Sequence, residues 1–185
     1  KRNEQADLNT PDGQALRKTL REAIHANDVL RAAARPKRFS RLLLSRTGEG
    51  GGYGLHIDNA LMGGGDTRIR ADLSFTLFLS DPDTYEGGEL VIEWLGATQT
   101  CKPKAGDIVL YPSTTLHRVE TVRSGERLAC VGWIESLIPD PAKRQILFDL
   151  QSVQGSLKPT MPAQSSEMLT LSKVVANLLR LWASP

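Results

Sequence analysis

Residues 71–95, ADLSFTLFLSDPDTYEGGELVIEWL, contain two apolar segments joined by a turn. The first segment, 71–80, is apolar enough for a strand in the middle of a sheet, and the second, 89–95, is a further strand candidate. The residues between them, 81–88, are rich in Asp, Pro and Gly, which favour turns. This stretch therefore predicts that the central part of the chain is built from β-strands.

Further strand candidates lie on both sides of this stretch, at 38–45, 53–58, 106–113 and 127–137. Two glycine-rich segments, 48–54 and 61–70, show no helical period and are expected to be loops. Many short strands with Gly, Pro and Asp between them are typical of a β-sandwich or a β-barrel.

Helical patterns flank the predicted strands. Thr10, Pro11 and Asp12 combine an N-cap, a proline at the first helical position and an acidic first turn, so we expect a helix to about Ala26. A shorter helix is expected to end before Pro36, because the residue before a proline disfavours the α conformation. The fold class is thus mainly β with flanking helices.

The C-terminal part is also predicted to be helical. A helix is expected over 142–153, a polar linker over 155–166 and a last helix after it. We therefore divide the chain into 1–138, an N-terminal helix with the β-domain, and 139–185, a helical extension packed on that core. The last helix has an apolar stripe, expected to pack against the barrel or a partner subunit, as in a homodimer: Met168, Leu171, Val175, Leu178 and Trp182.

Composition narrows the classes of partner. The chain has 185 residues, 40% of them hydrophobic, with a formal net charge of +2, which gives no basic field for nucleic acid. A basic cluster at residues 31–46 is interpreted as a solvated face. Two cysteines make no disulfide framework, and no apolar run is long enough to cross a membrane. A reduced, cytoplasmic setting without a signal peptide is expected.

His56 and Asp58 form the first part of a candidate metal site. Residues i and i+2 of a strand point to the same face, so these two side chains are expected to project together. His117 opens a later strand and would add a third ligand. Two histidines and one carboxylate leave coordination positions open, as in non-haem Fe(II) enzymes, whereas zinc more often has a fourth ligand or a catalytic water.

Arg127 is a candidate for binding an anionic ligand beside this site. A guanidinium fork binds a carboxylate through two hydrogen bonds, which would suit the distal carboxylate of 2-oxoglutarate. The alternative is a surface arginine paired with Glu126 or Glu120. Thr76 and Ser74 share one face of the strand 71–80, where a hydroxyl would help Arg127 or bond to the backbone instead. Arg46 would face either the site or the basic surface.

Four segments together resemble the Fe(II)/2-oxoglutarate dioxygenases, and more closely the bacterial PKHD-type hydroxylases of the prolyl/lysyl hydroxylase-like superfamily. They are YGLHIDN (53–59), DLSFTLFLSDPDTYEGGELVIE (72–93), GDIVLYPSTTLHRV (106–119), and Arg127 with Trp133. The similarity covers nearly the whole chain. Family members usually have another N-terminal section, and the loop RTGEGGGYG (46–54) has more glycine than their Arg-Tyr-Glu-Gly-Gly pattern, so the substrate side is expected to differ.

The resemblance implies a double-stranded β-helix (jelly-roll) core. It implies His56, Asp58 and His117 as Fe(II) ligands and Arg127 as the 2-oxoglutarate-binding arginine. Tyr53 corresponds to a tyrosine common in the active sites of the superfamily, and ascorbate, which keeps the iron reduced, is a frequent requirement there.

The expected activity is that of an oxidoreductase: a dioxygenase that hydroxylates an unidentified substrate and releases succinate and CO₂. The substrate would be a small molecule or a side chain of a peptide or protein. Two alternatives stay open at this point. One is a non-catalytic jelly-roll that senses iron or 2-oxoglutarate, and the other is a cupin-like metalloenzyme without an oxo-acid co-substrate.

Overall fold

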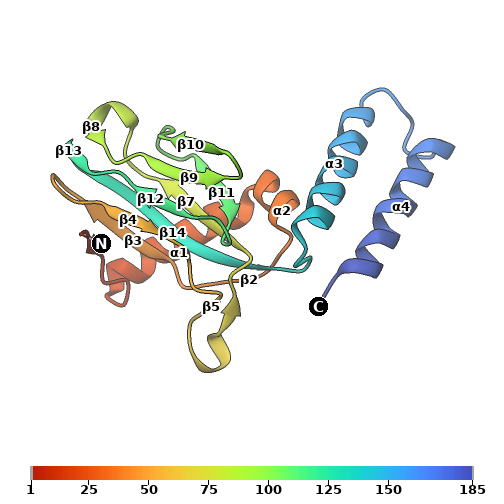
Figure 1. Ribbon diagram of the computed structural model, residues 1–185. Coiled ribbons are helices and arrows are strands. Elements are labelled where there is room, and N and C mark those ends of the chain that lie inside the picture. Colours follow the sequence, from red (N-terminus) through yellow and green to blue (C-terminus); the bar gives the residue numbers. More distant parts are fainter. Residues whose placement is uncertain (1, 185) are drawn as a thin grey trace. The chain divides into compact units, whose positions relative to one another are not determined.

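The computed structural model describes residues 2–184 and divides them into two compact units, each described by itself below (Figure 1). The first unit contains the residues up to Ile24 together with Arg38–Glu135. The second contains His25–Lys37 and the residues from Ser136 onward. The segment His25–Lys37 therefore belongs to the same unit as the C-terminal helices. The sequence-based division, which separated residues 1–138 from 139–185, did not include this.

The larger sheet of the described chain has six antiparallel strands, and one of its inner strands is β7 (Leu73–Phe78), which is buried on both faces. This burial explains why the segment is apolar without the alternation of a half-exposed strand. β7 pairs with β14 (Arg127–Ser136) on one side and β11 (Ile108–Pro112) on the other. β14 also pairs with β3 (Leu43–Thr47) and with β2 (Pro36–Phe39). β3 in turn pairs with β1 (Glu4–Gln5), which is an edge strand of the sheet.

The second sheet has four strands within residues 2–184, in the order β10 (Ala97–Cys101), β9 (Leu90–Trp94), β12 (His117–Val119) and β4 (Tyr53–His56). A core cluster joins the two sheets: Phe78 and Tyr111 come from the larger sheet, and Leu90 and Ile92 come from β9. Two packed antiparallel sheets are the layers of a jelly-roll. The prediction of a mainly β fold with flanking helices is confirmed.

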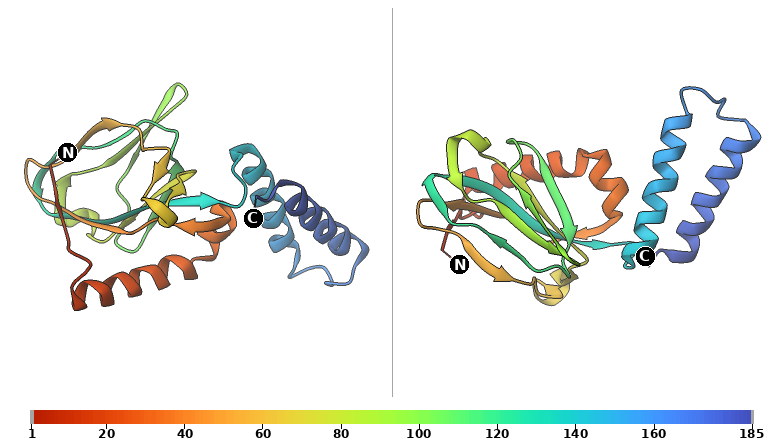
Figure 2. Two further views of the ribbon diagram at one scale, coloured as in Figure 1. Left: turned by 90° about the horizontal axis from the view of Figure 1, so that it is seen from below. Right: turned by 45° about the horizontal axis from the view of Figure 1, so that its top comes forward.

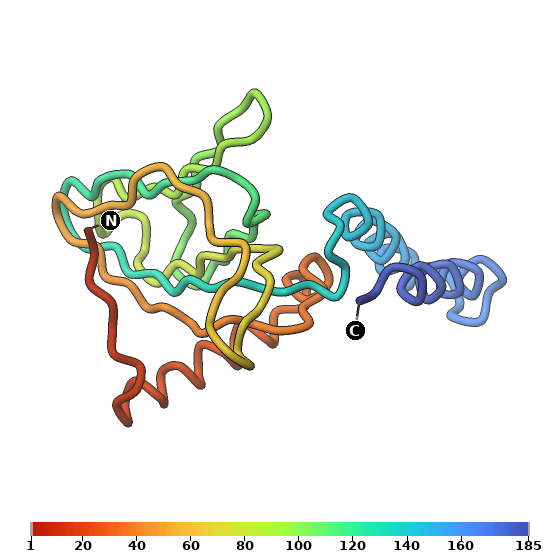
Figure 3. Tube along the Cα trace, turned by 60° about the horizontal axis from the view of Figure 1, so that its bottom comes forward, coloured from red at the N-terminus to blue at the C-terminus, as the bar shows by residue number. Residues whose placement is uncertain are grey.

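Two small ribbons extend this framework. β8 (Tyr85–Gly87) pairs with β13 (Val122–Gly125), and β5 (Leu61–Met62) pairs with β6 (Ile69–Arg70). The second ribbon, yellow in Figure 3, lies where the sequence predicted only a glycine-rich loop. Gly63 and Gly65 have positive φ values and form the turn between β5 and β6. These glycines are also the reason why the sequence pattern indicated a loop. Strand β10 was also missed, because a polar, exposed edge strand has no apolar pattern.

The N-terminal helices begin and end as predicted. α1 (Pro11–Ala26) starts after Thr10, whose hydroxyl accepts a hydrogen bond from the backbone N–H of Gly13. It buries Leu20 and Ile24 and runs along the outside of the strands (Figure 2). α2 (Asp28–Ala34) has Asn27 as its N-cap.

In the second unit, α3 (Pro141–Leu157) and α4 (Ser166–Trp182) form an antiparallel pair around Ile138, Leu147 and Val175. The stripe on the last helix was expected to pack against the barrel or a partner subunit. The structure instead packs it on α3, where Leu171, Leu178 and Trp182 contribute to this cluster. α3 continues past the predicted end at 153 to Leu157, and Pro159, which has no backbone N–H to donate to a further helical turn, lies two residues beyond its end. None of the helices in residues 2–184 has the combination of length and apolarity needed to cross a bilayer.

Candidate active site

A pocket opens between the two sheets of the first unit. Its polar residues come from both sides: β4 and β12 supply Tyr53, His56 and His117, and β7 and β14 supply Ser74, Thr76 and Arg127. Its apolar lining includes Leu43, Phe75, Leu90, Val119 and Val131.

The two histidines are brought together by strand register. His117 lies directly opposite His56 in the antiparallel pair of β12 and β4, and their ring centroids are 4.2 Å apart. The Nδ1 atom of His56 is 2.9 Å from the carbonyl oxygen of Gly54, and that of His117 is 3.1 Å from the carbonyl oxygen of Thr115. A carbonyl can only accept, so each Nδ1 carries the hydrogen and each Nε2 presents a lone pair.

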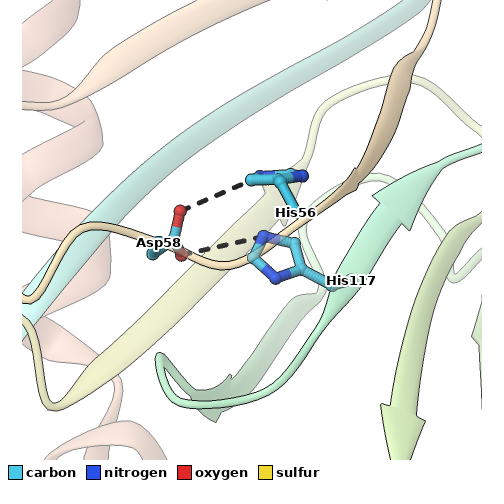
Figure 4. Close-up of side chains that lie close together, drawn as sticks. All are labelled: His56, Asp58 and His117. Carbon is cyan, nitrogen blue, oxygen red and sulfur yellow. Dashed lines mark ion pairs between the residues drawn. The ribbon is translucent and has the colours of Figure 1, made fainter.

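Asp58 faces both lone pairs (Figure 4). Its Oδ1 is 3.9 Å from Nε2 of His56, and its Oδ2 is 3.7 Å from Nε2 of His117. The expectation that one strand carries both His56 and Asp58 is wrong, because β4 ends at His56 and Asp58 lies in the loop that follows. The ligand atoms of the three residues nevertheless lie within 4.8 Å of one another, and this set could hold a metal ion.

Arg127 is a buried cation beside this site, with 3% of its surface exposed. Its guanidinium lies 5.0 Å from the centre of the Phe78 ring. Within residues 2–184, its Nε and Nη2 atoms and the buried hydroxyl of Tyr85 have no hydrogen-bond partner of normal geometry, although the side chains of Tyr85 and Arg127 interact. Burial lowers the pKa of Arg127, although interactions with Tyr85 and Tyr111 offset part of this effect.

The alternative interpretation of Arg127 as a surface arginine is wrong. Glu126 pairs with Arg46, and Glu120 pairs with Arg118. A buried guanidinium is costly unless it is paired or hydrogen-bonded, so Arg127 is a candidate for binding a negatively charged ligand in the pocket.

The remaining predicted residues also line the pocket. The ring of Tyr53 stacks on that of His56, with centroids 3.7 Å apart. Thr76 is buried and its side chain interacts with that of Tyr111, whose pKa is raised mainly by burial. Ser74 does not approach Arg127 but donates to Asp58 Oδ2 at 2.6 Å. Neither hydroxyl is tied to the backbone in the way that the alternative interpretation expected.

Arg46 is the one candidate that faces away from the pocket. It is exposed and pairs with Glu4 at 2.9 Å and with Glu126 at 3.7 Å. Its neighbours Ser45 and Thr47 line the pocket instead, as strand alternation requires. Arg46 therefore belongs to the basic surface.

Sequence reasoning gave no role to Tyr111 and did not place Trp133 in the pocket. Both are Cα partners of Ser74, from β11 and β14, so register aims them at the same space. Tyr111 lies on the same face of its strand as Val109, and Trp133 on the same face as Val131, because residues two apart point the same way. Once the strand pairing was known, this pattern would have indicated the position of the two aromatic side chains.

The donor set fits Fe(II) with a carboxylate co-substrate. Two imidazole nitrogens and one carboxylate form the ligand set of non-haem Fe(II) oxygenases. Arg127, in the same pocket, provides an unpaired guanidinium for a second anionic group.

Comparisons with known proteins agree with this geometry. The model of the 2OG-Fe(II) oxygenase superfamily matches residues 42–135. A PKHD-type hydroxylase of Hyphomonas neptunium is 52% identical over 183 residues, which are 99% of this chain and 82% of that protein. A PKHD-type hydroxylase of Synechococcus elongatus is 51% identical over the same shares of the two chains.

The fold is also similar to a solved structure. A prolyl hydroxylase from Trichoplax adhaerens, in complex with a peptide fragment of hypoxia inducible factor, has a TM-score of 0.52 and 17% identity over 78% of this chain and 64% of that chain. At this identity the similarity concerns the fold alone. The superfamily model and the two relatives establish that this chain is a 2-oxoglutarate- and Fe(II)-dependent dioxygenase and belongs to the PKHD-type hydroxylases of the 2OG-Fe(II) oxygenase superfamily.

Proposed function

We propose that His56, Asp58 and His117 hold the Fe(II) of this dioxygenase and that Arg127 binds the distal carboxylate of 2-oxoglutarate. The observation that carries this assignment is the unpaired, buried guanidinium of Arg127 in the same pocket as the metal-binding set. A structural arginine would have a carboxylate partner in the protein, and this one has none within residues 2–184.

The reaction converts a C–H bond of the substrate, O₂ and 2-oxoglutarate into an alcohol, succinate and CO₂. One oxygen atom of O₂ enters succinate and the other enters the new hydroxyl group. The iron supplies the activation of O₂, while the protein supplies orientation and exclusion of water.

The residues of the chain have separate tasks in this proposal. The two backbone carbonyls fix the imidazoles with their Nε2 lone pairs toward the ion. Tyr53 supports the His56 ring by stacking, and Thr76 orients Tyr111 in the co-substrate pocket. The apolar side chains of Leu43, Leu90 and Val131 keep that pocket dry, which strengthens the charge interaction of Arg127 with a carboxylate.

We extend the proposal to the partners of the reaction. The substrate is a small molecule or a side chain of a peptide or protein, and ascorbate keeps the iron reduced. The dependence of turnover on ascorbate tests the second point. A cytoplasmic location and a homodimer stay predictions, and the molar mass of the chain in solution tests the latter.

The decisive experiment is succinate release from 2-oxoglutarate by protein loaded anaerobically with Fe(II) and then exposed to O₂. We expect iron-dependent turnover that Arg127→Ala abolishes and that Arg46→Ala, an exposed arginine on the neighbouring strand, leaves unchanged. Binding of iron and 2-oxoglutarate without succinate release would favour the sensor alternative. Equal turnover by the wild type and Arg127→Ala would contradict the proposed role of Arg127.

A further inference from the structure

We propose that two buried serine hydroxyls, those of Ser113 and Ser74, form a relay that positions Asp58 as a metal ligand. The inference rests on the proposed function, because it assigns Asp58 to the ion. It gives Ser74 and Ser113 a task that the motifs of the sequence do not indicate: they are positioning residues that act on the metal only through the carboxylate.

The hydrogen bonds of this relay have a defined direction. Ser74 Oγ lies 2.6 Å from Asp58 Oδ2 and 2.7 Å from Ser113 Oγ. A carboxylate accepts only, so the single hydrogen of the Ser74 hydroxyl goes to Asp58. Ser113 must then donate to Ser74. Consecutive hydrogen bonds of this kind polarise and strengthen one another in a buried setting.

The relay compensates for the place of Asp58 in the fold. His56 and His117 sit on paired strands, and backbone carbonyls orient their rings. Asp58 lies in the loop beyond β4, where no strand pairing fixes it. Ser74 reaches this loop from β7, an inner and fully buried strand, so the loop ligand is tied to a strand that is paired on both sides.

Both hydroxyls are themselves well fixed. Ser74 is 2% exposed and Ser113 is 4% exposed, so water does not compete for their hydrogen bonds. The backbone N–H of Ser113 donates to the carbonyl oxygen of Asp72 at 3.1 Å, which holds the corner after β11 beside β7. The relay therefore has little freedom, and the carboxylate at its end shares that restriction.

The choice of a hydroxyl has a chemical consequence. Ser74 engages one lone pair of Asp58 Oδ2, which leaves Oδ1 and the second lone pair of Oδ2 available to an ion. A neutral donor leaves the negative charge of the carboxylate in place, whereas an arginine or a lysine at this position would neutralise it. The relay thus orients the ligand without weakening its attraction for a divalent cation.

The test measures the affinity of the full chain for Mn²⁺, a divalent probe that is stable in air, by calorimetric titration. Loss of a residue that orients a metal ligand typically weakens binding roughly 10- to 100-fold. We expect a loss in this range for Ser74→Ala and a smaller loss for Ser113→Ala. The double variant should bind no more weakly than Ser74→Ala, within about twofold, because Ser113 acts only through Ser74.

Ser80→Ala is the matched control. Ser80 also follows β7 and makes two hydrogen bonds, to the carbonyl oxygen of Glu126 and from the N–H of Leu128, but it does not line the pocket. We expect wild-type Mn²⁺ affinity for it. The melting temperature of each metal-free variant separates a loss of folding from a loss of binding.

The outcomes separate this inference from the proposed function. If the wild type binds Mn²⁺ no more tightly than His117→Ala does, the metal assignment and the relay both fail. If His117→Ala loses binding while Ser74→Ala binds like the wild type, the relay alone is overturned. Losses that multiply in the double variant would also overturn it, because they would show that the two serines act independently.

Discussion

The metal group (His56, Asp58 and His117) and the arginine group (Arg127 and Tyr85) are both largely buried in the β-unit, but their polar atoms are satisfied differently. Each side chain of the metal group has a further polar contact, with a backbone carbonyl or with a serine hydroxyl. In the arginine group, two guanidinium nitrogens and the Tyr85 hydroxyl have no hydrogen-bond partner in the described chain.

This difference separates two ways of preparing a binding site. The metal group is organised in advance, so binding an ion requires little rearrangement of its ligands. The arginine group retains buried donors without a partner, which an incoming anion would satisfy, and we expect the free protein to be less stable for it. The predictions below follow this contrast, from the largest expected effect to the smallest.

Replacing a member of the metal group should have the largest effect. His117→Ala removes one of the two imidazole nitrogens, and we expect Mn²⁺ affinity to fall by more than about 100-fold, beyond the loss typical of an outer orienting residue. Succinate release should fall below detection. His25→Ala, which removes a histidine at the end of α1, should keep wild-type affinity and turnover. Retention of tight Mn²⁺ binding by His117→Ala would show that the ion binds elsewhere.

Arg127→Met tests the opposite property of the arginine group. We expect weaker 2-oxoglutarate binding by about 2–5 kcal/mol, as when one partner of a buried charge pair is removed. The ligand-free variant should nevertheless be more stable than the wild type, by about 1 kcal/mol or more, since an unpaired buried charge is replaced by an apolar chain.

Calorimetry of 2-oxoglutarate binding and urea unfolding of the ligand-free protein measure these two quantities. Arg46→Met is the control, because that arginine is exposed and paired with Glu4 and Glu126. A lower stability of ligand-free Arg127→Met would indicate that the protein itself satisfies the guanidinium, and the contrast between the two groups would be wrong.

The sequence could predict the features that depend on local patterns. The strands, the first helix and the two histidines follow from local patterns, because apolar runs and capping residues act over a few positions. The close approach of His56 to His117 depends on the register of β4 with β12, which one sequence does not specify. The carboxylate-binding chemistry of an arginine suggested Arg127 as a further candidate, and the resemblance to a family supported that prediction.

The support of Asp58 was not predictable in this way. Ser74 and Ser113 are 16 and 55 positions away from it along the chain, and nothing in the sequence connected either serine with Asp58. The expected shared strand for His56 and Asp58 would have made such support unnecessary. Only the end of β4 at His56 shows why another residue has to hold the carboxylate.

Two tyrosines allow the contrast to be tested with one chemical change, the loss of a hydroxyl. The side chain of Tyr111 interacts with that of Thr76, and both residues are buried. Tyr111→Phe should therefore reduce the unfolding free energy of the ligand-free protein by about 1–3 kcal/mol, because Thr76 loses its partner. Urea unfolding measures this change. An unchanged stability would show that the Thr76 hydroxyl finds another partner. Thr76→Val would then also leave the unfolding free energy unchanged.

Tyr85→Phe should have the smallest effect on the ligand-free protein. The Tyr85 hydroxyl is buried without a hydrogen bond of normal geometry, so removing it leaves no new unsatisfied group and stability should change by less than about 0.5 kcal/mol. The hydroxyl nevertheless interacts electrostatically with Arg127. If this interaction directs the guanidinium, 2-oxoglutarate affinity should fall about two- to tenfold, the range expected for one hydrogen bond. A loss of stability as large as that of Tyr111→Phe would mean that this hydroxyl is satisfied in the free protein, and only the guanidinium would then distinguish the arginine group from the metal group.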